Sequence, residues 1–73
     1  MKMSDETIII ADINKNSKEI IRVSKRNYKG HELVDIRVFY PDKDGDFLPT
    51  AKGISFKLSL LPQLTEILSL IEE

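Results

Sequence analysis

The chain has 73 residues, a formal net charge of −1 and no cysteine. A domain of this length buries only about 60% of its unfolded surface, so it usually needs a disulfide, a metal or a partner subunit for stability. The lack of cysteine excludes disulfides and thiolate metal sites, and the single histidine, His31, cannot form a zinc site alone. These constraints favour a homodimer and predict no metal and no cofactor.

Charge is unevenly distributed along the chain. Six basic residues lie between Lys15 and His31 against a single acid, Glu19, which makes a local basic patch on a near-neutral protein. No apolar run approaches the ~20 residues that span a bilayer, and no signal peptide is recognisable. We therefore expect a soluble protein with no membrane partner, located in the cytoplasm with the nucleoid, or in the nucleus if the source is eukaryotic.

The first segment, residues 1–17, is expected to be a lead-in to a domain over residues 18–73. Its β-branched run at Ile8–Ile10, continued by Ile13, suits a short strand. Residues 14–17 (NKNS) have the composition of a turn. Whether the segment from Ile8 to Ile13 is an extra strand or a dimer arm stays open.

Alternation predicts two strands after this lead-in. Over residues 18–26, Ile21 and Val23 fall on one face and Arg22 and Arg26 on the other, as in a half-buried strand with a cationic outer face. The NYKG turn at residues 27–30 then leads into the strongest predicted strand, residues 31–40.

The face assignment within residues 31–40 raises a question about one aromatic side chain. Val34 and Ile36 lie on one face and Arg37 on the other, and Tyr40 shares the face of the valine and isoleucine. A stacking role for Tyr40 therefore requires a bulge or strong twist just before it. Otherwise its ring is part of the core.

A turn at residues 42–46 (DKDGD) follows Pro41, which ends the long strand. This turn lacks the Gly and Glu that a calcium loop needs at its sixth and twelfth positions, so calcium is rejected. Residues 47–48 resume a strand that Pro49 ends, and residues 52–58 form a further strand with a bulge or bend at Gly53.

The C-terminal segment predicts one helix with Ser59 as N-cap, running to about Ile71. Its apolar residues share an arc about 120° wide, which Leu70 widens further. We expect the helix to pack on its own sheet and to offer the extra flank to a second copy. The fold class is α+β: a four-stranded curved antiparallel sheet with one C-terminal helix, dimerised through the helices.

The sequence contains no nucleophile near a credible base, and no phosphate-binding glycine motif, so an enzyme is not expected. Tyr28 lies between Arg26 and Lys29, and Tyr40 lies near Arg37. Cations that hold the backbone, interleaved with aromatic rings that stack on bases, are typical of single-stranded nucleic-acid sites. The alternative is that these are ordinary solvated side chains on an outer strand face.

Several short motifs at fixed spacing resemble a known family. They are Tyr28-Lys29-Gly30, Leu33, Asp35-Ile36-Arg37, Phe39-Tyr40, Asp42, Gly45, Pro49, Lys52-Gly53-Ile54-Ser55, Gln63-Leu64 and Glu66. Together they resemble the C-terminal domain of the transcriptional coactivator positive cofactor four, over about residues 19–70 without a gap. The lack of a long Ser- and Lys-rich tail makes the chain similar to the short bacterial and phage members.

The resemblance implies four antiparallel strands and a helix, pairing of two copies through their helices, and binding of single-stranded DNA with little sequence preference. It places the DNA-contacting positions on Arg26, Tyr28, Lys29, Arg37, Tyr40 and Lys52. His31 replaces a family lysine and adds a pH-dependent contact, whereas Leu48 and Ala51 replace two basic positions. Fewer cations imply weaker binding and a shallower salt dependence.

The expected function is single-stranded DNA binding in transcription, replication or repair, with RNA left open as a ligand and the transcription machinery as a further partner. One alternative is a protein-interaction module whose sheet docks an acidic peptide or a polymerase subunit. Another is a structural subunit of a transcription complex. The steep salt dependence of nucleic-acid binding would separate these readings.

Overall fold

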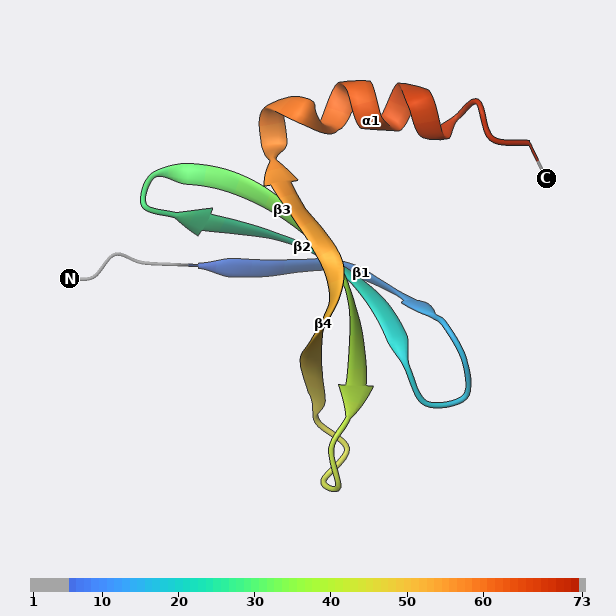
Figure 1. The fold of residues 1–73 in the computed structure, drawn as a ribbon. Helices are drawn as coiled ribbons and strands as arrows, with labels where there is room; N and C mark the ends of the chain where they lie inside the picture. The colour runs from blue at the N-terminus through green and yellow to red at the C-terminus, as the bar shows by residue number, and fades with distance from the viewer. Residues whose placement is uncertain (1–5, 73) are drawn as a thin grey trace.

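The protein forms one antiparallel sheet followed by one helix. Its structure, a computed structural model, describes residues 6–72. The four strands have the order β1-β2-β3-β4, so each strand pairs with its neighbour in sequence. Figure 1 shows the strands twisting strongly across one another and the helix leading away from the end of β4. The elements are β1 (Thr7–Asn14), β2 (Ile20–Tyr28), β3 (His31–Pro41), β4 (Phe47–Lys57), a 3-10 turn (Leu58–Leu60) and α1 (Leu61–Leu68). The predicted four-stranded antiparallel sheet with one C-terminal helix is confirmed, whereas the dimer predicted with it stays a prediction.

The four observed strands differ from the strands predicted from the sequence pattern. The segment left open at residues 8–13 belongs to β1, which pairs with β2 from Thr7 opposite Arg26 to Asn14 opposite Ile20. The predicted break at Pro49 is wrong, because β4 continues through this residue. Since β4 is an edge strand, the missing N–H of a proline leaves the sheet intact. Residues 1–5 of the predicted lead-in lie outside the described residues.

The bend predicted at Gly53 belongs to a bulge in β4. Gly53 lies opposite Arg37 and Pro49 opposite Phe39, so β4 uses four residue steps (49 to 53) where β3 uses two (37 to 39). The Thr50 hydroxyl holds the bulge: it donates to the carbonyl oxygen of Val38 at 2.8 Å and accepts from the Lys52 amide at 3.1 Å. A Cβ on Gly53 would lie 2.6 Å from the carbonyl oxygen of Ile36, so only glycine fits there.

The hairpin between β2 and β3 has a two-residue loop. Lys29 and Gly30 both have positive φ, 52° and 82° respectively. A type I′ hairpin loop requires this of both central residues, and its twist matches that of the flanking strands. The predicted NYKG turn is confirmed, with the left-handed conformation extending to a lysine.

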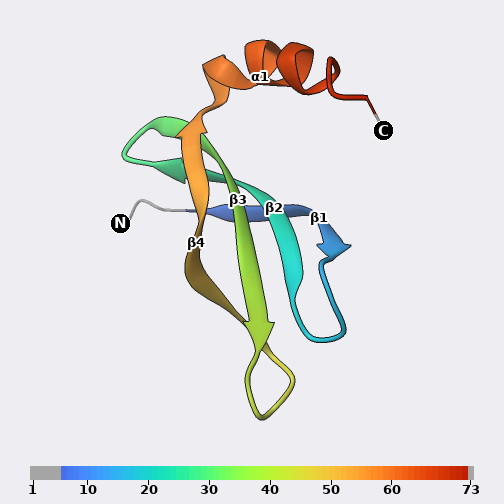
Figure 2. The ribbon, with the colours of Figure 1, turned by 45° about the vertical axis from the view of Figure 1, so that its right-hand side comes forward.

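The helix differs from its prediction in three respects. Ser59 lies within the 3-10 turn and does not cap the helix, whose N-cap is Leu60 without a side-chain hydrogen bond. The helix ends at Leu68, where Ser69 begins a short turn, and not near Ile71. The expected packing of α1 on its own sheet is wrong: no residue of α1 is buried, and Figure 2 shows it lying beyond the end of β4.

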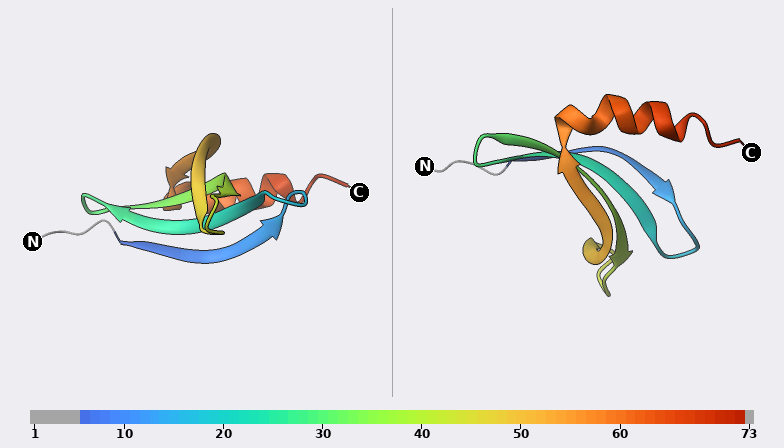
Figure 3. Two further views of the ribbon diagram at one scale, coloured as in Figure 1. Left: turned by 90° about the horizontal axis from the view of Figure 1, so that it is seen from below. Right: turned by 45° about the horizontal axis from the view of Figure 1, so that its top comes forward.

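The hydrophobic core of one chain is very small. Among the described residues, Ile20 and Val34 are the buried hydrophobic side chains, each 6% exposed. Ile67, Leu68 and Leu70 are more than half exposed. Figure 3 shows the single, strongly twisted sheet with no second layer across most of its surface. One chain therefore leaves most of its apolar surface uncovered.

Candidate nucleic-acid interface

The strand register sorts the side chains of the sheet onto two faces. Residues opposite one another in an antiparallel pair share a face, and faces alternate along each strand. The first, called the polar face here, carries Arg22, Ser24, Arg26, Tyr28, His31, Leu33, Asp35, Arg37 and Phe39. The opposite, apolar face carries mainly Ile21, Val23, Val34, Ile36, Val38, Ile54 and Phe56.

A cation–tyrosine cluster lies on the polar face at the end of the sheet nearest the helix. The Arg26 guanidinium carbon lies 5.6 Å from the centroid of the Tyr28 ring, and the Lys29 ammonium lies 5.2 Å from it. Tyr28 is 39% exposed. The Asn27 side chain accepts a hydrogen bond from the Gly30 amide at 3.2 Å and so steadies the hairpin that presents Lys29. His31 faces Tyr28 across the ladder. The structure thus brings these predicted site residues together.

Arg37 occupies the middle of the polar face and is already engaged. Its Nη2 and Nε donate to the Asp35 carboxylate at 2.8 and 3.0 Å, and its Nη1 donates to the carbonyl oxygen of Thr50 at 3.1 Å. The hydrogen bonds that Arg37 donates to the Asp35 carboxylate raise the pKa of Arg37 above its usual value. Asp35 itself is 7% exposed. Arg37 therefore ties β3 to the bulge of β4 and lines a surface hollow of about 440 Å³ that Arg26 also lines.

Arg22 also lies on the polar face, but it was not among the site residues predicted from the sequence. Its Nε and Nη2 donate to the two carboxylate oxygens of Asp12 at 2.8 and 3.1 Å. Its guanidinium carbon lies 4.8 Å from the ring centroid of Phe39 and 5.8 Å from that of Phe47. The alternation placed Arg22 beside Arg26, but nothing local in the sequence pointed to Asp12 on β1.

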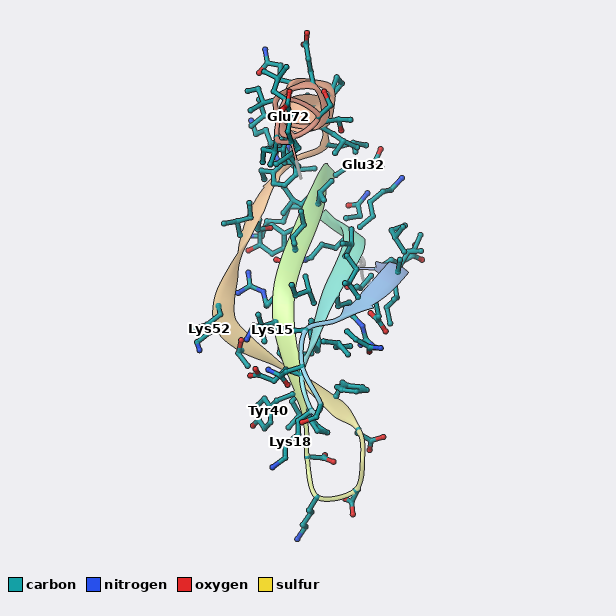
Figure 4. The ribbon with its side chains drawn as sticks, turned by 90° about the vertical axis from the view of Figure 1, so that its right-hand side faces the viewer. Lys15, Lys18, Glu32, Tyr40, Lys52 and Glu72 are labelled. Atoms are coloured by element: carbon teal, nitrogen blue, oxygen red, sulfur yellow. The ribbon has the colours of Figure 1, made fainter. Side chains whose placement is uncertain are left out.

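Tyr40 and Lys52 lie away from this surface. Tyr40 keeps the alternation of β3, because the bulge is on β4 and the β2–β3 register is continuous. It therefore belongs to the apolar face, as predicted, yet Tyr40 is 43% exposed and is not part of the core. Figure 4 shows Tyr40 beside the β1–β2 loop and Lys52 pointing outward from β4. The predicted site residues thus occupy both faces and both ends of the sheet.

Other classes of site find no support in the part of the chain that the structure describes. Across residues 6–72, no three His, Asp or Glu side chains gather as a metal would require. Within the same range, no helix is long and apolar enough to cross a membrane.

The chain combines a curved four-stranded sheet, a C-terminal helix, and a sheet face that carries cations and aromatic rings. This combination is typical of small nucleic-acid-binding domains. The family described as Transcriptional Coactivator p15 (PC4) matches residues 15–67. The chain belongs to this family, and the predicted resemblance is confirmed. The family is one of coactivators and not of enzymes, which agrees with the expectation drawn from the sequence.

Two solved structures resemble this chain in fold. A PC4 homologue from Burkholderia pseudomallei, BPSL1147, is 42% identical with a TM-score of 0.83, covering 94% of this chain and 93% of that one. A bacteriophage T5 homologue of the coactivator, implicated in recombination-dependent DNA replication, is 22% identical with a TM-score of 0.60 over 92% of this chain and 73% of that one, so it supports the fold alone.

A curated plant relative completes the comparison. It is the RNA polymerase II transcriptional coactivator KIWI of Arabidopsis thaliana, 45% identical over 53 residues. These residues make up 73% of this chain and 45% of the plant protein, so the chain spans less than half of that relative's length. The match to the Burkholderia protein covers enough of the chain to extend into β1, which the family match at residues 15–67 does not include.

Proposed function

We propose that this protein binds single-stranded DNA with low sequence preference and acts in transcription, replication or repair. Its membership of a coactivator family supports a role linked to nucleic acid. The observation that carries the finer proposal is the exposed Tyr28 ring between two cations, Arg26 and Lys29. An aromatic ring can stack on a base of any sequence while flanking cations hold the phosphates, which gives affinity without sequence readout.

The proposal requires that these cations are available to phosphate. Among the ion pairs of the described residues, Lys25 is held by Glu32 at 3.0 Å, and Arg22 and Arg37 are held by aspartates. Arg26 and Lys29 take part in none of these pairs. A phosphate that approaches Tyr28 therefore displaces no carboxylate, and its binding gains from counterion release.

The functional unit that we propose is a homodimer joined through the helices. The chain exposes 5806 Å², whereas a compact monomer of 8.4 kDa exposes about 4,600 Å². The uncovered helix side chains, with Leu61 at 37% and Leu68 at 51% exposure, account for part of this excess. A second copy supplies a partner of the same chemistry for each helix, as an isologous contact requires.

Fluorescence anisotropy with labelled oligo-dT, compared with duplex of the same length, tests the binding proposal. Tyr28→Ala is expected to weaken binding by about 1–3 kcal/mol, the usual cost of a lost base stack. Tyr28→Phe is the matched control, since it keeps the ring and is expected to bind nearly as the wild type does. Equal affinity for single strand and duplex, or no loss in Tyr28→Ala, would overturn the proposal. Parallel titration with oligo-rU decides between DNA and RNA.

A further inference from the structure

The hairpin between β2 and β3 and the 3-10 turn after β4 border a surface hollow at the helix end of the sheet. The hollow has a volume of about 430 Å³. We call it the hairpin hollow; it is lined by Gly30, His31, Glu32, Lys57, Leu58 and Ser59. Figure 1 and Figure 2 both show the β2–β3 hairpin beside the end of β4, where the chain leads into the helix. The hollow thus joins two segments that are distant in the sequence.

Lys57, the last residue of β4, lies on the polar face together with the Tyr28 cluster. It is opposite Leu33 of β3, which is opposite Arg26 of β2, so these three residues form one row across the sheet. The backbone of Lys57 is extended, with φ −66° and ψ 140°, so the alternation of β4 holds up to this residue. Because neighbouring strands lie about 4.8 Å apart, the backbones of Arg26 and Lys57 are about 10 Å apart.

The charge of Lys57 is available to an anionic ligand. Lys57 is exposed, and none of the ion pairs among the described residues includes it. Glu32 is the acid among the lining residues, and Lys25 pairs with it at 3.0 Å. By the alternation of β3, Glu32 also belongs to the opposite face of the sheet. A phosphate that approaches Lys57 in the hairpin hollow therefore meets no unpaired carboxylate there.

This cation lies outside the motifs from which the site was predicted. The last motif on this strand ends at Ser55, and two basic positions of the family are Leu48 and Ala51 here. Lys57 returns a cation to the same strand, at the end nearest Tyr28. A lysine binds phosphate as a point charge on a flexible stem and needs no fixed geometry, which suits an exposed residue at the end of a strand.

We propose that a single strand stacked on Tyr28 crosses the sheet from β2 to β4 at the helix end, and that Lys57 binds a phosphate on the far side of this crossing. The inference rests on the proposed function and adds to it a further residue, Lys57, and the direction of the strand. Arg26 and Lys29 hold the backbone on the near side. The half-buried Leu33 forms an apolar floor between the cations of the two edges.

The salt dependence of oligo-dT binding by the full chain counts the phosphate contacts. Lys57→Ala is expected to reduce the slope of log affinity against log salt by about 0.7, because one contact is lost. Lys57→Arg keeps the charge and is expected to retain the slope of the wild type. The matched control is Lys43→Ala, which removes the same charge from the acidic turn between β3 and β4 and is expected to leave the slope unchanged. Lys57→Gln replaces Lys57→Ala if circular dichroism detects a change of fold in that variant.

A double substitution tests the crossing itself. Cations about 10 Å apart hold different phosphates, so Arg26→Ala and Lys57→Ala are expected to act additively and together to reduce the slope by about 1.4. A double variant with the same slope as either single variant would place both cations at one phosphate and overturn the crossing.

The outcomes separate this inference from the function on which it rests. If the wild type binds oligo-dT, Tyr28→Ala weakens binding and Lys57→Ala behaves like Lys43→Ala, the role of Lys57 is overturned and the proposed function stands. If the wild type does not bind single strands at all, both are overturned. A reduced slope in Lys57→Ala with no loss of affinity in Tyr28→Ala would overturn the crossing over Tyr28 together with the proposed stacking.

Discussion

Substitution of Gly53 by alanine tests the close approach of β4 to β3 at the bulge. A Cβ at this position would lie 2.6 Å from the Ile36 carbonyl oxygen, 2.7 Å from the Arg37 Cα and 2.8 Å from the Arg37 Cβ. These neighbours are backbone atoms and a Cβ, so none can rotate away. Restoring ordinary contact, about 3.4 Å, would require β3 and β4 to separate locally by about 0.8 Å.

Overpacking of this kind costs about 1–3 kcal/mol. At about 4–8 °C per kcal/mol for a domain of this size, Gly53→Ala should melt at least about 4 °C and up to about 24 °C below the wild type. Circular dichroism at one fixed protein concentration measures this shift, because the melting temperature of an associating protein depends on concentration. Ser55→Ala on the same strand is the control and should change stability by less than about 0.5 kcal/mol. An unchanged melting temperature for Gly53→Ala would refute the close strand approach.

Other expected outcomes follow from single contacts. Lys29→Gly should raise stability by up to about 1 kcal/mol in thermal melts, because glycine adopts positive φ freely, while weakening oligo-dT binding. Arg22 lowers the pKa of Asp12, so their pairing contributes stability that is present above the unfolded-state pKa and lost as pH falls through the lower folded value. Acid titration of Asp12→Asn should lack that contribution; identical acid transitions would count against the pairing. Ile67→Asp, on the exposed helix, should shift sedimentation toward the monomer, and an unchanged dimer would exclude this helix face from the interface.

The sequence predicted the elements that rest on local chemistry. Alternation located β2 and β3, Gly30 marked the hairpin, and glycine and proline marked the ends of the acidic turn. The resemblance to the coactivator family then selected Tyr28 and its flanking cations, which the structure gathers at one end of the polar face. These features were predictable because the residues that determine each of them lie close together in the sequence.

Features that depend on distant residues were not predictable in the same way. The break expected at Pro49 is absent because β4 is an edge strand, and only the topology reveals this position in the sheet. The apolar arc of α1 correctly predicted a helix, but the periodicity does not specify which surface, if any, covers its apolar side. Likewise, Arg37 and Lys52 have the same charge in the sequence, and only the contacts of Asp35 and Thr50 distinguish the engaged guanidinium from the free ammonium.

The strand order has a consequence for the kinetics of assembly. Every ladder joins neighbours in sequence, so the sheet closes by successive hairpins, each on the order of 1–10 μs in isolation, with no long chain loop to order first. Association of two copies into the proposed dimer is instead bimolecular. At nanomolar protein and an ordinary rate constant of roughly 10⁶ M⁻¹s⁻¹, two chains meet only on the order of every 10³ s. For the proposed dimer, a sample freshly diluted out of denaturant would therefore contain folded sheets not yet associated. Refolding experiments should resolve a rapid phase whose rate is independent of protein concentration and a slow phase whose rate is proportional to it.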